Sequence, residues 1–148
     1  MPHIERTAHV QWEGNVARGA GSLTAGSGAF SQLPFSLPTR IGAAEGKTSP
    51  EELLAAAHGG CLTMSVAGVL TGDGTPPGDL TTTVTIHMDE VEGQGHQIVG
   101  SVVEIIARVD GVDETALQAA VQKADETCPF SALLRRAGAT VDVSARLA

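Results

Sequence analysis

The stretch Ser49-Pro50-Glu51-Glu52-Leu53-Leu54-Ala55-Ala56-Ala57-His58-Gly59-Gly60-Cys61 decides the fold of this chain. Ser49 is a good N-cap, Pro50 suits the first helical position, and Glu52 completes a capping box, so a helix begins here. The pattern predicts that the helix runs to about Leu70, before a segment rich in Gly and Pro at residues 72–78. Its body is apolar on nearly every face, which predicts a helix buried on all sides.

The two cysteines of the chain stand in different settings. Cys61 lies within the apolar helix, and Cys128 lies in the junction Glu126-Thr127-Cys128-Pro129-Phe130, where the proline excludes a regular helix. We expect the first thiol to be held in the helix wall and the second to be free to reorient. A protein that reduces an oxidant with one thiol and closes a disulfide with another needs such a pair. Packing is the alternative for both thiols, because most buried cysteines act as small hydrophobic residues.

Length and composition favour one globular domain, residues 1–148, with a core built mainly from aliphatic side chains. The net charge of -8 argues against nucleic acid or an anionic membrane as a main partner, since both attract clustered Lys and Arg. The helix approaches the length of a membrane span, but His58, Gly59 and Gly60 interrupt it, so we expect no membrane. The first residues lack the apolar stretch of a secretory signal, which predicts a cytoplasmic protein.

Short alternating segments predict strands on both sides of this helix. The first 40 residues read as short strands separated by glycine turns, with Phe35-Ser36-Leu37 among the alternating segments. Apolar and polar side chains then alternate over three further stretches, which predict strands with one buried face: residues 83–88, 103–109 and 141–147.

Two helices are predicted between the last two of these strands. Asp113 is the expected N-cap of the first, whose apolar stripe extends to Cys128, and the second is expected from Phe130 to Arg136. The order of strands, buried helix, strands, two helices and strand predicts an α+β domain.

Activation of Cys61 requires positive charge from outside its own turn of helix. By helix geometry the residue lies roughly 18 Å from the N-terminus of its helix, and the helix dipole fades within the first turn. Burial alone disfavours the thiolate and makes a thiol inert. Candidates for the missing charge are His58, Arg40 and Lys47, although a hydrogen-bonded structural role is the simpler interpretation of His58.

Other chemistries have little support in the sequence. The histidines and cysteines are scattered without metal-binding spacing, and no phosphate-binding glycine loop is present, so we expect no metal and no cofactor. Two alternatives to a redox enzyme remain open. One is a non-enzymatic binding or stress-related structural dimer with inert thiols, and the other is a cysteine hydrolase with His58 as its base.

The helix motif, quoted above and continuing through Cys61 to Met64-Ser65, resembles that of the osmotically inducible protein C and organic hydroperoxide resistance family. Further segments of the chain are similar to that family: Trp12-x-Gly14 with Gly19-x-Gly21, Pro38-Thr39-Arg40, and Cys128-Pro129-Phe130-Ser131. The resemblance implies an intertwined homodimer, in which two mainly antiparallel sheets wrap two central helices.

The same resemblance implies a thiol peroxidase that reduces organic hydroperoxides without metal or haem. Cys61 would be the peroxidatic cysteine and Cys128 the resolving one. Arg40 would stabilise the thiolate and bind the peroxide, and Glu51 would orient that arginine. Arg18 is the alternative to Arg40, because the other branch of the family uses an early arginine. A small or lipoyl-type dithiol would be the reductant.

Two expectations complete the picture of the site. Leu53, Leu54, Met64 and Phe130 are expected to line it, which would suit an alkyl or aryl peroxide. Glu51 and Cys61 lie about 15 Å apart along one helix. If both belong to one site, the glutamate would therefore meet the cysteine of the second copy, with the two central helices antiparallel.

Overall fold

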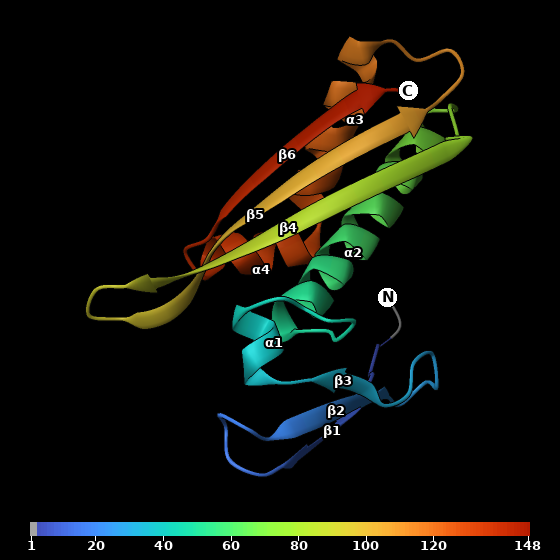
Figure 1. Ribbon diagram of the computed structural model, residues 1–148. Coiled ribbons are helices and arrows are strands. Elements are labelled where there is room, and N and C mark those ends of the chain that lie inside the picture. The colour runs from blue at the N-terminus through green and yellow to red at the C-terminus, as the bar shows by residue number, and fades with distance from the viewer. Residues whose placement is uncertain (1–2) are drawn as a thin grey trace. The chain divides into compact units, whose positions relative to one another are not determined.

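The computed structural model describes residues 3–148, and it divides at the start of the long helix into two compact units, one reaching to Pro50 and one running from Glu51 to Ala148. Figure 1 labels the helices and strands of both units. Each unit holds one three-stranded sheet.

The N-terminal unit is an antiparallel sheet followed by a short helix. Its strands β1 (Ala8–Glu13), β2 (Ala20–Ala25) and β3 (Leu33–Phe35) pair in the order β1-β2-β3. The expected alternation through residues 35–37 is wrong for a strand, because α1 (Leu37–Ile41) follows at once. Ser36 is its N-cap, and its hydroxyl accepts a hydrogen bond from the Thr39 amide at 3.3 Å.

The C-terminal unit places helices against one face of a mixed sheet. Its elements are α2 (Pro50–Gly72, whose first residue belongs to the other unit), β4 (Asp79–Val91), β5 (Gly95–Arg108), α3 (Glu114–Thr127), α4 (Pro129–Arg136) and β6 (Thr140–Leu147). Strands β4 and β5 pair antiparallel and β5 and β6 pair parallel, in the order β4-β5-β6. Figure 1 shows α2 and α3 on the same side of this sheet.

The predicted elements of this unit are confirmed. Asp113 caps α3 by accepting from the Ala116 amide at 2.8 Å, and the alternating strands turn their apolar side chains to the helices. The core lies between these layers, where α2, β5 and α3 supply most of the buried side chains: Leu62, Val66, Leu70, Val103, Ile105, Ala107, Leu117, Ala120, Val121 and Ala124.

Helix α2 is covered on one side only in the single chain, so its burial on all sides stays a prediction that depends on a second copy. The covered side includes Gly59, where a Cβ atom would lie 2.9 Å from Cγ2 of Val84, so the missing side chain lets β4 approach closely. The open side is a stripe of exposed residues: Glu52, Ala56, Gly60, Met64 and Gly68. The physical reason is simple, since one sheet can cover only one side of a helix.

By length and composition α2 is the one helix within residues 3–148 that could cross a membrane. Leu62, Val66 and Leu70 nevertheless lie in the core cluster with side chains of β5 and α3. This packing is typical of the core helix of a globular protein.

Candidate active site

The two cysteines lie side by side. Cys61 is on α2, Cys128 connects α3 to α4, and their side chains are within hydrogen-bonding range as two free thiols. Cys61 is half-buried, whereas Cys128 has no exposed surface. The expectation that Cys128 is free to reorient is therefore wrong. The apolar stripe of α3 continues to Cys128 and carries it into the core.

The first turn of α4 supplies an unexpected contact to Cys61. Pro129 occupies the start of α4, and the backbone amide of Phe130 lies near the Cys61 sulfur, where it lowers the pKa of that thiol. Burial and, after it, the hydrogen bond and charge of Cys128 act in the opposite direction, and together they raise the pKa of Cys61 above its ordinary value. The neighbours of Cys61 in the C-terminal unit therefore disfavour a thiolate at neutral pH.

His58 is fully buried, and its imidazole is hydrogen-bonded to two serines. Its Nδ1 lies 2.8 Å from Oγ of Ser101 on β5, and its Nε2 lies 2.8 Å from Oγ of Ser131 on α4. Neither serine has exposed surface. This confirms a hydrogen-bonded structural histidine, and it shows where the partners are.

Charge around His58 does not make it a cation. Burial lowers its pKa, the carboxylate of Asp125 raises it, and the guanidinium of Arg135 lowers it again, with a net lowering. Arg135 Nη2 lies 2.6 Å from Oδ2 of Asp125, so these two charges largely offset each other. A neutral imidazole donates from one nitrogen and accepts at the other. His58 therefore supplies no positive charge to Cys61, and both nitrogens that could act as a hydrolase base are occupied by serines.

The remaining predicted site residues fall in both units. Arg40 is exposed on α1 in the N-terminal unit, and so is Arg18 in the turn between β1 and β2. Glu51 belongs to the C-terminal unit and is partly buried at the start of α2. The roles given to these residues stay predictions.

The four residues expected to line the pocket also differ in setting. Phe130 is partly buried and packs with Cys61 against the core cluster. Leu53 and Leu54 are half-buried in the first turns of α2, and Met64 is 71 % exposed. The C-terminal unit thus brings Cys61, Cys128 and Phe130 together, while the pocket itself stays a prediction.

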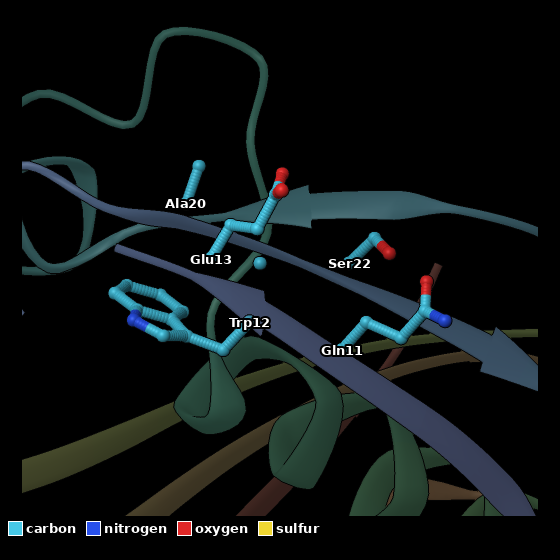
Figure 2. A pocket seen from close by; sticks show the side chains of 6 residues that line it. Gln11, Trp12, Glu13, Ala20 and Ser22 are labelled. Atoms are coloured by element: carbon cyan, nitrogen blue, oxygen red, sulfur yellow. The ribbon is translucent and has the colours of Figure 1, made fainter. Parts of the chain in front are cut away.

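A hollow lies on the N-terminal hairpin, away from the two cysteines in the sequence, and is lined by residues of β1 and β2. Figure 2 shows Gln11, Trp12, Glu13, Ala20 and Ser22 around it, all from β1 and β2. Trp12 packs on Phe35 with ring centroids 5.5 Å apart, and its Nε1 donates to the Gly14 carbonyl at 2.9 Å. Neither thiol lines this hollow, and its aromatic pair acts in packing the hairpin.

Within residues 3–148, no group of three or more His, Cys, Asp and Glu side chains is arranged to hold a metal ion.

Comparison with known proteins gives the family. A family model described as OsmC-like protein matches residues 42–144. The chain belongs to the OsmC-like protein family.

Two relatives of the chain carry different names, one as an OsmC peroxiredoxin and one as an organic hydroperoxide resistance protein. Peroxiredoxin OsmC of Escherichia coli (strain K12) is 33% identical over 132 residues, covering 89% of this chain and 91% of that protein. An organic hydroperoxide resistance protein of Xanthomonas axonopodis pv. citri (strain 306) is 32% identical over 116 residues, covering 77% of each.

The fold agrees with solved OsmC-like structures. The organic hydroperoxide resistance protein OhrB of Bacillus subtilis superposes with a TM-score of 0.70 at 26% identity, over 96% of this chain and 98% of that one. The expected α+β fold of this family, with two sheets and a long helix, is therefore confirmed.

Sequence patterns alone did not indicate three contacts at this OsmC-like site. Ser101 and Ser131 lie far from His58 in the sequence, and isolated serines carry no signal of their own. The amide of Phe130 could have been found, because Pro129 after Cys128 marks a helix start, and helix starts present free amides.

The lowered pKa of His58 predicts a loss of stability in mild acid. The unfolded chain takes up a proton as the pH falls through the ordinary value of 6.5, while the buried imidazole resists protonation until a lower pH. The contribution of neutral His58 is therefore present above that pH and is lost below it. Between about pH 7 and about pH 5.5, we expect the free energy of unfolding in urea to fall more steeply in the native protein than in His58→Gln. Parallel pH profiles of the two proteins would contradict this assignment.

Proposed function

We propose that this protein is a thiol-dependent peroxidase that reduces organic hydroperoxides to alcohols in defence against oxidative stress. The observation that carries the proposal is the contact between a half-buried Cys61 and a fully buried Cys128. The names of the relatives, a peroxiredoxin and an organic hydroperoxide resistance protein, support the same chemistry.

The reaction proceeds in three steps: reduction of the peroxide, formation of the disulfide, and reduction of the disulfide by a dithiol. The Cys61 thiolate attacks the O–O bond, takes one oxygen as a sulfenic acid and releases an alkoxide, which gains a proton to become the alcohol. The Cys128 thiol then displaces hydroxide from the sulfenic acid, forming a disulfide and water. An external dithiol, small or lipoyl-type, returns both cysteines to thiols by exchange and leaves as its own disulfide.

The burial of the two cysteines suits a peroxidatic role for Cys61 and a resolving role for Cys128. Cys61 is the thiol that a peroxide from solvent can reach, and Cys128 is screened from direct oxidation. Because the two thiols already lie side by side, the sulfenic acid can be trapped before a second peroxide oxidises it further.

Activation of Cys61 is the step that the C-terminal unit does not provide. Its neighbours there raise the thiol pKa, so a cation must stabilise the thiolate. We assign this role to Arg40 and the orientation of that arginine to Glu51. If no cation is supplied, the thiols are inert, and the protein is a binding or structural dimer instead.

The working form is a homodimer in the cytoplasm. An open groove runs along the exposed side of α2 beside β4 and is mostly apolar, with Ala56, Gly60, Met64 and Leu80 among its lining residues. A second copy of α2 would cover this side, and small residues would let the two helices approach. Leu53, Leu54, Met64 and Phe130 then form an apolar pocket for an alkyl or aryl peroxide.

The cysteine roles can be separated by substitution. Cys61→Ser should abolish peroxide consumption, because no base is available to activate a hydroxyl there. Cys128→Ser should complete about one turnover, after which Cys61 over-oxidises. Consumption of cumene hydroperoxide and of hydrogen peroxide with a dithiol, followed by mass spectrometry of Cys61, measures both effects. Sustained turnover by Cys128→Ser, with Cys61 intact, would show that Cys128 is not the resolving thiol.

The arginine assignment is tested by the pH dependence of Cys61 alkylation. Arg40→Ala should raise the Cys61 pKa and slow the peroxide step about tenfold or more at neutral pH, as expected for loss of a neighbouring cation. Glu51→Ala should have a milder effect of the same sign, and Arg18→Ala is the control. A larger effect of Arg18→Ala would transfer the role to that residue. A native Cys61 that stays unalkylated below about pH 8 would favour the inert dimer.

The dimer is tested on the exposed side of α2. Met64 is 71 % exposed in the single chain, so Met64→Glu costs little in a monomer but places a charge in the proposed interface. We expect it to shift sedimentation from dimer to monomer and to lower peroxide turnover. Leu133→Glu on α4, where the native side chain is 57 % exposed, is the matched control and should remain dimeric. A native protein that sediments as a fully active monomer would exclude the shared site.

A further inference from the structure

We propose that His58 is a positioning residue for disulfide closure: by binding Ser131 it fixes the first turn of α4, and with it Cys128, against Cys61. This inference rests on the proposed roles of the two cysteines, and it concerns the second step of the reaction only.

The two contacts join the same pair of helical turns. His58 lies one turn before Cys61 on α2, and Ser131 lies one turn after Cys128, which is the N-cap of α4. The bond of 2.8 Å between Nε2 of His58 and Oγ of Ser131 therefore runs beside the contact between the thiols. A bond placed there resists any rotation of α4 that would separate the sulfurs.

The other nitrogen of the ring is anchored to the sheet. Nδ1 of His58 lies 2.8 Å from Oγ of Ser101 on β5, so the imidazole is held from both ends. His58, Ser101 and Ser131 all have 0 % exposed surface, so water does not compete for these bonds. Of these two bonds, the one from Nε2 to Ser131 reaches α4, while the one to Ser101 joins the ring to the sheet.

The ion pair of Arg135 with Asp125 holds the last turn of α4 to α3, so the bond from His58 to Ser131 acts on its first turn. The chain leaves α3 at Thr127 and enters α4 at Pro129, and Cys128 between them makes no side-chain hydrogen bond to cap α4. Disulfide formation requires the two sulfurs to approach to about 2.05 Å with the Cα atoms about 4.4–6.8 Å apart. A small displacement of α4 would therefore slow closure.

Closure can be followed without any peroxide by using 2,2′-dithiodipyridine. The half-buried Cys61 attacks the reagent, forming a mixed disulfide and releasing one pyridinethiolate. Cys128 then attacks the Cys61 sulfur, forms the protein disulfide and releases the second pyridinethiolate. The first phase depends on reagent concentration and the second does not, so stopped-flow absorbance separates them.

Two serine variants form a matched pair. Ser131→Ala and Ser101→Ala each remove one buried hydroxyl and one bond of 2.8 Å to the same imidazole. We expect Ser131→Ala to slow the second phase by about fivefold to tenfold, the effect of one buried hydrogen bond. Ser101→Ala should keep the native second phase, although urea unfolding shows a comparable loss of stability. Equal slowing in both variants would overturn the proposal, because it would reduce the effect to general destabilisation.

Two substitutions of His58 test whether a bond to Ser131 alone is enough to maintain the rate of closure. The variant His58→Gln places a side-chain amide near the position of Nε2, toward Ser131, whereas His58→Asn places its amide near Nδ1, toward Ser101. We expect His58→Gln to close at nearly the native rate and His58→Asn to close as slowly as Ser131→Ala. Equal second phases in the two His58 variants would refute the positioning role. Because no peroxide is used, a failure here leaves the proposed peroxidase intact, and a protein without peroxidase activity can still show the effect.

Discussion

The nonpolar surface of α2 is the constraint on which the rest of the structure depends. A helix that is apolar on nearly every face loses stability wherever it meets water, so each element packed on it contributes by covering a part of it. Strand β4 can approach because Gly59 has no side chain, and β5 and α3 complete the covered side. The thiol site is built on the same helix, at the point where α4 begins against it. Core packing and chemistry therefore share one surface.

Much of this arrangement follows from local patterns in the sequence. The start of α2 at Pro50, the cap of α3 at Asp113 and the alternation in the last three strands rest on short-range rules, and these elements form as expected. The error at residues 35–37 has the same origin, since Ser36 fits an alternating strand and an N-cap equally well.

The candidate site was less predictable, because its contacts join segments far apart in the chain. The two cysteines could be identified from their motifs, but the burial of Cys128 depends on how α3 packs against the sheet. The same holds for Ser101 and Ser131, which gain significance only when β5 and α4 meet His58. Sequence patterns report periodicity and caps, whereas they say little about which side chain closes a buried hydrogen bond.

The parallel pairing of β5 with β6 has a consequence for how the protein is made. Gly100 pairs with Thr140, and α3, Cys128 and α4 all lie in the connection between these two strands. Pairings between residues far apart in the chain form late, since the entropy of closing the loop must be lost first. During synthesis, the strand that completes this sheet emerges last. The newly made chain therefore carries both cysteines before the structure that orients them exists. Only the completed fold places the two thiols side by side.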